Sequence, residues 1–156
     1  MAARSALVLL ASVALGACVT ASASSRPDRL APEEIVRARQ AAFHMSAAAM
    51  GNMRAAVEAG REPSQQAFAA RGVARWAEVL PTMFPEETRG VGPSRARAEI
   101  WTNKADFEAK AAAYATEAGK LAAVAKAGDR AAFELQFKAA TATCKSCHDA
   151  YQAPAG

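Results

Sequence analysis

The sequence has few of the residues that build β-sheets, and it has only three cysteines. Val, Ile and Thr are scarce beside a very large number of alanines, and alanine favours helices and lets them pack closely. Hydrophobic residues make up 52% of the 156 residues, which suits one globular domain. The composition therefore predicts a single all-α domain and nearly excludes a sheet. Because the number of cysteines is odd, a disulfide framework cannot account for all of them.

A block of basic residues is also lacking. Lys and Arg together number 19 against 15 for Asp and Glu, and the net charge of +4 is spread along the chain. Proteins that grip nucleic acid through its phosphates gather such charges in one segment or patch. We therefore expect no nucleic-acid partner.

The apolar run at residues 6–17 is too short to span a bilayer as a stable helix. It follows Arg4, as in an export signal. Cleavage after Ala21-Ser22-Ala23 would remove residues 1–23, whereas Leu15-Gly16-Ala17-Cys18 resembles a lipobox that would remove residues 1–17 and leave a lipid anchor on Cys18. Both alternatives predict a periplasmic protein, soluble or lipid-anchored, with its folded domain at residues 28–156.

A first helix is predicted over residues 32–60. Pro32, Glu33 and Glu34 suit a helix N-terminus, and Gly60 supplies a stop. One series of apolar residues repeats every seven positions: Val36, Phe43, Met50 and Val57. A second series lies three residues after the members of the first and contains an arginine: Arg39, Ser46 and Met53. A buried arginine needs a partner for its charge.

Three further helices follow. The second, over residues 64–84, has Ser64 as predicted N-cap and is expected to bury Phe68, Trp76, Val79, Leu80 and Met83. The third begins at a Thr102 cap, ends at Gly128 and has a stripe of Ile100, Phe107, Tyr114 and Leu121. The fourth is capped by Asp129, continues to about residue 152 and has Phe133, Phe137, Ala140, Cys144, Cys147, His148 and Tyr151 on one face.

The connection at residues 85–98 contains Pro and Gly and is long enough to be a crossover. Four helices that each have one apolar stripe bury those stripes on one another. The sequence therefore predicts an antiparallel up-down-up-down four-helix bundle.

The fourth helix contains Cys144-Lys145-Ser146-Cys147-His148, a C-x-x-C-H sequence typical of c-type haem attachment. The two thiols add to the porphyrin vinyl groups, and the imidazole coordinates the iron. On a helix these three side chains lie within one turn on the same face, so they reach one side of a flat macrocycle. The bundle is therefore expected to enclose one covalently bound haem c.

Other chemistries for these residues fit less well. A redox-active C-x-x-C pair belongs at a helix start in a βαβ setting. A zinc site would have to combine Cys144, Cys147 and His148 with His44, although three ligands in one stretch of helix suit a tetrahedral site poorly. A disulfide between the two cysteines would leave the adjacent histidine unexplained.

Only eight residues follow His148, and none of them is Met, His or Lys. A second iron ligand therefore cannot come from downstream, and another helix must cover the opposite face of the haem. The stripe around Phe43 is the expected cover.

Together these segments resemble the cytochrome c′ family, the class II c-type cytochromes. The similar residues run from Pro32 to Phe43, from Ala98 to Thr102 and from Cys144 to Tyr151, and the resemblance covers about residues 31–152. It implies thioether bonds at Cys144 and Cys147, axial ligation by His148, and contacts of Arg39 and Gln40 near the haem propionates. Phe43 falls where low-spin relatives of the cytochrome c-556 type have a ligating Met, and phenylalanine cannot ligate. Where many members have a basic residue four positions after the axial histidine, this chain has Gln152.

The expected function is a periplasmic haem protein with five-coordinate iron that transfers electrons, binds diatomic gases such as nitric oxide and carbon monoxide, or does both, and is not an enzyme. One alternative is a low-spin electron carrier in which Met45 or Met50 ligates the iron. Another is a haem-based redox enzyme, which would need His44 turned inward, although His44 lies about 100° around the helix from Phe43. The family often pairs through the helices expected at 32–60 and 64–84, which implies a homodimer. The sequence does not identify the redox partner.

Overall fold

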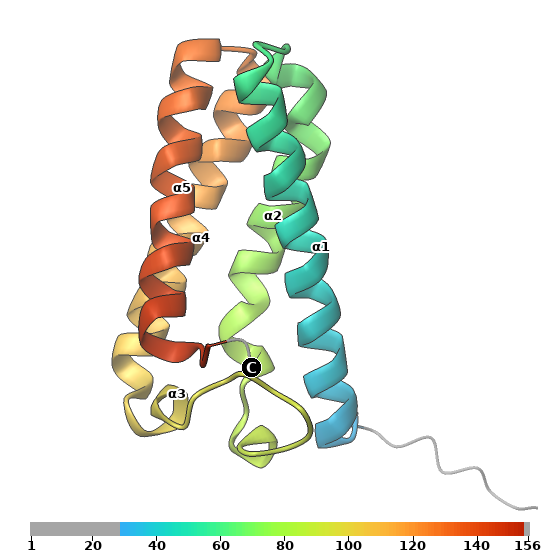
Figure 1. Cartoon of the computed structure of the whole chain (residues 1–156), viewed down its shortest axis with the longest axis vertical. Helices are drawn as coiled ribbons and strands as arrows, with labels where there is room; N and C mark the ends of the chain where they lie inside the picture. The colour runs from blue at the N-terminus through green and yellow to red at the C-terminus, as the bar shows by residue number, and fades with distance from the viewer. Residues whose placement is uncertain (1–28, 155–156) are drawn as a thin grey trace, which may run out of the picture.

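The computed structural model describes residues 29–154 and has four long helices side by side (Figure 1). These are α1 (Pro32–Glu58), α2 (Ala67–Val79), α4 (Lys104–Ala127) and α5 (Arg130–Tyr151). Short helical turns connect or extend them: η1 (Pro63–Gln66), η2 (Leu80–Met83), η3 (Glu86–Thr88) and α3 (Glu99–Thr102). The chain runs up and down through the bundle, so the predicted antiparallel four-helix fold is confirmed.

The described residues contain no β-strand, and a single isolated bridge joins Ala96 to Gln152. None of the helices described is both long enough and apolar enough to cross a membrane. The predicted signal segments at 1–17 or 1–23, with Cys18, lie outside the described residues.

Several helix ends follow directly from local sequence. The backbone N–H of Ala31, the N-cap residue of α1, donates to the Glu34 carboxylate at 2.9 Å, and this bond stabilises the helix N-terminus. Gly128 ends α4 with a φ of 76°, a left-handed conformation that glycine adopts without steric cost. The Asp129 side chain accepts from the Ala132 N–H at 3.0 Å, as predicted for its cap.

Two predicted caps are wrong. Neither Ser64 nor Thr102 caps a helix: the second helix begins with a turn at Pro63, and Asn103 takes the N-cap position of α4. Proline already fixes the backbone at the first helical position, so no side-chain cap is needed at residue 64.

The buried face of α2 also differs from the prediction, because Phe68 is 80% exposed and Val79 is 48% exposed. Small residues at spacings of three and four face inward instead: Ala70, Val73, Ala74 and Ala77. Leu80, just after α2, is buried as predicted. Alanine on this face lets α2 approach α4 closely, whereas Phe68 lies on the opposite side of the helix, about 200° around from Ala70, and is exposed to solvent.

Aromatic rings fill the end of the core near the crossover. Phe84 lies 5.1 Å from Phe107, and Phe107 lies 5.4 Å from Tyr151, both measured between ring centroids. The predicted stripe of the third helix is confirmed, because Ile100, Phe107, Tyr114 and Leu121 are all buried.

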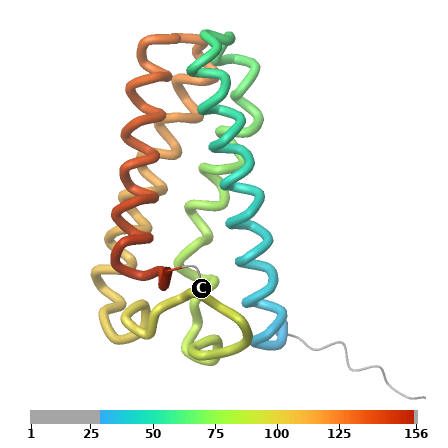
Figure 2. Tube along the Cα trace, viewed as in Figure 1, coloured from blue at the N-terminus to red at the C-terminus, as the bar shows by residue number. Residues whose placement is uncertain are grey.

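In the view of Figures 1 and 2, α5 lies on the left and α1 on the right, and these two helices make few contacts with each other. The pairs α2 with α4 and α4 with α5 pack much more extensively. The crossover passes across the end of the bundle where α1 begins and α5 finishes (Figure 2). The candidate site lies at this end.

Candidate functional site

A cavity of about 460 Å³ lies between α1 and α5 at the crossover end. Its volume is in the range of small-molecule and cofactor sites. α1, α5, the crossover and the core all contribute to its wall: Arg39, Gln40, Phe43, His44 and Ala47; Cys147, His148, Tyr151 and Gln152; Pro93, Ser94, Arg95 and Ala96; Leu80, Phe84, Ile100 and Phe107.

The C-x-x-C-H residues lie on the last two turns of α5. Cys144 and Cys147 are half-buried free thiols that pack against the core, and Cys147 borders the cavity. Burial raises the pKa of the Cys144 thiol, and the neighbouring Cys147 raises it further. Burial also raises the pKa of Cys147, against the opposing charge of Lys110. Redox-active cysteines require a lowered pKa, so a thioredoxin-like role has no support here.

His148 borders the cavity and is exposed to solvent. Partial burial lowers its pKa, and the charge of Arg95 lowers it further, while Asp149 acts in the opposite direction. A lowered pKa keeps the imidazole neutral at neutral pH, and the neutral form is the one that ligates a metal.

Cys144 and Cys147 are not joined by a disulfide, and the described side chains around them do not form a zinc site. Residues 29–154 contain no group of three or more His, Cys, Asp or Glu side chains placed to hold a metal ion. His44 is exposed on α1 and does not join Cys144 and Cys147 in such a group.

Phe43 borders the cavity on the α1 side and is half-buried. Two aromatic neighbours hold its ring: Trp76 at 5.3 Å in an edge arrangement and Phe84 at 6.5 Å, between centroids. Trp76 itself does not border the cavity, and its buried indole N–H has no hydrogen-bond partner within the described part of the chain.

Arg39 is buried, at 2% exposure, on the same wall. Its Nη1 donates to the Met83 carbonyl at 3.0 Å and to the Thr88 hydroxyl at 2.9 Å, and its Nη2 donates to the Ser94 hydroxyl at 3.3 Å. The guanidinium carbon lies 4.3 Å from the centroid of the Phe84 ring. Burial lowers the pKa of Arg39. Among residues 29–154 it forms no ion pair with a carboxylate.

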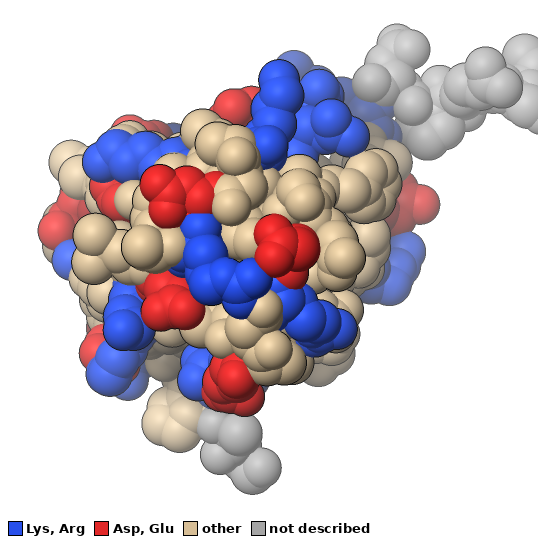
Figure 3. All heavy atoms as spheres, turned by 90° about the horizontal axis from the view of Figure 1, so that it is seen from above, with Lys and Arg blue, Asp and Glu red and all other residues tan. Residues whose placement is uncertain are grey.

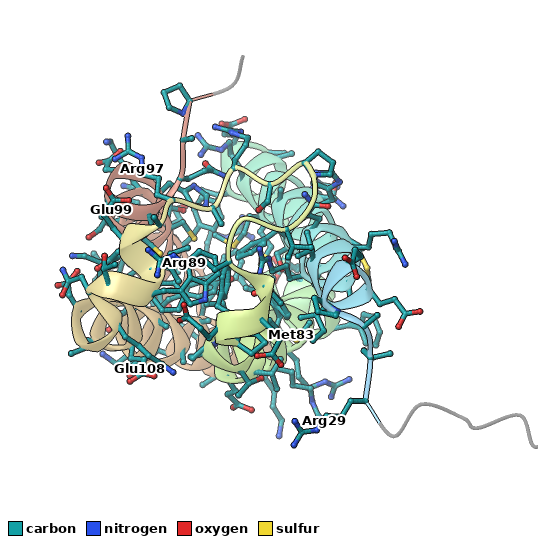
Figure 4. All side chains as sticks on the ribbon, turned by 90° about the horizontal axis from the view of Figure 1, so that it is seen from below. Arg29, Met83, Arg89, Arg97, Glu99 and Glu108 are labelled. Atoms are coloured by element: carbon teal, nitrogen blue, oxygen red, sulfur yellow. The ribbon has the colours of Figure 1, made fainter. Side chains whose placement is uncertain are left out.

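Through these contacts Arg39 holds the crossover against α1. Its place in the helical stripe did not predict this role. Gln40 has the same function, since its side-chain amide donates to the Pro93 carbonyl at 2.7 Å. Figure 4 views this end of the bundle, and its labelled residues Met83, Arg89, Arg97 and Glu99 belong to the segments that close it.

Arg95 and Ser94 border the cavity although they are about 50 residues from the haem-attachment motif in the sequence. The bridge between Ala96 and Gln152 brings them there. No signal in the sequence pointed to them, because an irregular crossover has no periodicity that predicts which residues face inward.

Other potential iron ligands lie away from the cavity or at its rim. Met45 is 73% exposed, and neither Met45 nor Met50 borders the cavity. His44 borders the rim but is exposed, which agrees with its predicted surface position.

Comparison with known proteins gives a consistent result. A family described as Cytochrome C' matches residues 34–152. A cytochrome c' from Alcaligenes xylosoxydans xylosoxydans is 36% identical over 125 residues, which cover 78% of this chain and 94% of the relative.

Two solved structures have the same fold. The crystal structure of cytochrome c' from Thermochromatium tepidum superposes with a TM-score of 0.76 at 32% identity, covering 80% of this chain and 98% of the other. A nitric oxide complex of a mutant of cytochrome c prime from Alcaligenes xylosoxidans superposes with a TM-score of 0.71 at 30% identity, covering 79% and 97%.

Proposed function

The chain belongs to the cytochrome c′ family, and on this basis we propose that it is a periplasmic haem protein whose iron has His148 as its single protein ligand. Members of the family carry covalently attached haem c and act as electron carriers or gas-binding proteins. The chain is therefore a c-type haem protein and not an enzyme. Its finer function rests on the residues around the cavity.

The observation that carries the proposal is the arrangement across the cavity, with Cys147 and His148 of α5 on one wall and Phe43 of α1 on another. Cys144 and Cys147 provide the two thioether bonds, and His148 holds the iron. The bound haem supplies an iron that changes oxidation state and accepts a diatomic gas.

The chemistry of the wall fits a flat aromatic group with acidic substituents. Aromatic side chains line the cavity, among them Phe43, Phe84, Phe107 and Tyr151. Arg39 brings a buried positive charge without a carboxylate partner among the described residues, and a haem propionate would be such a partner. Arg39 and Gln40 would therefore receive the haem propionates, beside the part of the crossover that these residues hold.

Phe43 would cover the second face of a haem held by His148, and because phenylalanine cannot ligate, the iron would be five-coordinate. Packing against Trp76 and Phe84 supports this position, because it restricts the rotation of the Phe43 ring. The low-spin alternative needs a Met from α1, but Met45 is mostly exposed and Met50 does not border the cavity.

The optical spectrum of the ferrous protein tests this proposal. A high-spin, five-coordinate spectrum at neutral pH is expected, and nitric oxide or carbon monoxide should change it. A six-coordinate low-spin spectrum without added ligand would show that Met or His from α1 is bound and that Phe43 does not cover the iron.

We further propose a homodimer through α1 and α2. Exposed apolar side chains on these two helices support it, namely Met45, Phe68 and Val79. Sedimentation of the wild type against Phe68→Ser tests this interface: the variant should dissociate at concentrations where the wild type is dimeric, and equal association of both proteins would refute it.

Export to the periplasm, with a signal at 1–23 or with lipid attached to Cys18, completes the proposal. The N-terminal residue of the mature protein distinguishes the two alternatives. A chain that begins at Ser24 and stays in the aqueous fraction supports the first, whereas a membrane-bound form released by Cys18→Ser supports the second.

A further inference from the structure

Residues 95–97 of the crossover are bonded to the C-terminal end of α5. The Arg97 N–H donates to the Tyr151 carbonyl at 3.0 Å, and the Ala153 N–H donates to the Arg95 carbonyl at 2.8 Å. The side chain of Arg95 joins this pairing, because its Nε donates to the Ala153 carbonyl at 2.7 Å. The Arg95 side chain is thus held by hydrogen bonds at this place, although it is exposed.

Arg95 and His148 border the same cavity, at the side formed by α5 and the crossover. The bond from Arg95 Nε to the Ala153 carbonyl holds the Arg95 side chain beside the end of α5, five residues after His148. Arg39, the other arginine of the wall, lies across the cavity on α1.

Other groups near His148 contribute less charge. Gln152, one turn further along the chain, is uncharged. Asp149 is paired with Lys145 at 2.6 Å, so its field is partly cancelled. Arg97 donates to the Ala150 carbonyl of α5 at 3.5 Å, and Lys110 lies near Cys147, but neither side chain borders the cavity. On the side formed by α5 and the crossover, Arg95 is therefore the positively charged residue of the cavity wall.

We propose that Arg95 is a charge-setting residue that raises the reduction potential of the iron bound by His148. The ferric centre carries one more positive charge than the ferrous centre, so a fixed cation nearby destabilises the ferric state more. The inference depends on the proposed role of His148 as axial ligand. It adds a residue from the crossover to a site whose haem-attaching cysteines and iron ligand all come from α5.

Potentiometric titration of the holoprotein tests this role. We expect Arg95→Gln to reduce the ferrous-to-ferric ratio at a fixed electrode potential by about tenfold, which is a fall of about 59 mV for a one-electron couple. Arg95→Lys, which keeps the charge, should retain most of the wild-type potential. An equal fall in both variants would assign the effect to the hydrogen bond with Ala153 and overturn the proposal.

Two further variants separate charge from structure. Arg97→Gln removes the same charge from a neighbouring half-buried arginine that does not border the cavity, and it should change the potential much less. Adding Gln152→Arg to Arg95→Gln should raise the potential again, because it restores a cation near His148 without restoring the Arg95 hydrogen bond. No recovery, or an equal effect of Arg97→Gln, would refute a local role for Arg95.

Failure of this inference can be told from failure of the proposed function. If Arg95→Gln keeps its covalent haem and five-coordinate spectrum but also keeps the wild-type potential, only the role of Arg95 is wrong. If the wild type lacks thioether-bound haem or does not use His148, the proposed function itself fails.

Discussion

Thr88 offers a direct test of how the crossover is held over the cavity. It is fully buried, its hydroxyl accepts from Arg39 Nη1 at 2.9 Å, and it donates to the Pro85 carbonyl at 2.8 Å. Thr88→Val keeps the shape of the side chain and removes only the hydroxyl. The substitution therefore leaves one N–H of a buried guanidinium and one carbonyl without this partner, while creating no cavity.

Each buried polar group left unsatisfied costs about 1–3 kcal/mol. For the two groups together, with Met83 still accepting from Arg39, we expect Thr88→Val to lower the free energy of unfolding by about 3 kcal/mol. In a domain of this size, that loss corresponds to a fall in Tm of roughly 10 °C.

Urea unfolding of the ferric holoprotein, followed by circular dichroism at 222 nm, measures the change. Thr116→Val is the matched control, because Thr116 is exposed on α4, and its loss of stability should be under about 0.5 kcal/mol. If Thr88→Val is within 1 kcal/mol of the control, Arg39 does not depend on this hydroxyl and the account of the crossover is wrong.

Three other perturbations have defined outcomes. Acid-acetone extraction should leave haem on the wild type but remove it from a Cys144→Ala/Cys147→Ala double variant; extraction of all the wild-type haem would contradict thioether attachment. Phe43→Ala should raise carbon monoxide affinity by about tenfold, since a ligand no longer displaces packing worth about 1 kcal/mol or more, and Phe43→Met should give a low-spin spectrum; unchanged affinity and spin state would place Phe43 away from the iron. Burial and a hydrogen bond to Asp106 raise the pKa of Tyr151 to about 12. Its contribution to stability is therefore complete below about pH 10 and lost as the pH rises through about 12, so Tyr151→Phe should flatten the decline of stability over that range in alkaline urea titrations; equal slopes would refute it.

The parts of the fold that the sequence predicted well are those determined by neighbouring residues. The end of α4 at Gly128 and the Asp129 cap each depend on interactions within a few positions. The stripe of α4 repeats with the period of a helix, so its buried face was predicted correctly.

The errors arose where contacts between helices decided which residues are buried, because the sequence pattern of a single helix does not contain those contacts. Phe68 is a large apolar residue on α2, yet alanines occupy the face toward α4, because close helix packing there requires small side chains. Hydrophobicity alone favoured burying the larger residue. Contacts with α4 set the orientation of α2 in the bundle, and in that orientation the alanines are buried and Phe68 is exposed.

Mixed charge at the far end of the bundle contrasts with the cavity wall. Figure 3 views that end, where Lys and Arg alternate with Asp and Glu and no single sign dominates. Around the cavity the described wall has two arginines and no acidic side chain. Arg39 was predicted because it interrupts a periodic stripe, whereas Arg95 was missed because its position depends on the pairing of the crossover with residues 151–153.

The motif at 144–148 depends on neighbouring residues in the sequence, whereas the position of Arg95 depends on tertiary contacts. The proposed haem attachment depends on five consecutive residues, 144–148, whose spacing places the reacting side chains within one helical turn. The electrostatic surroundings of the same site depend on an irregular segment that α1 holds through Arg39 and Gln40, and that α5 holds through main-chain bonds. Because an irregular connection tolerates substitution better than a packed helix, we expect Arg95→Gln to change the reduction potential while leaving the bundle and the C-x-x-C-H motif intact.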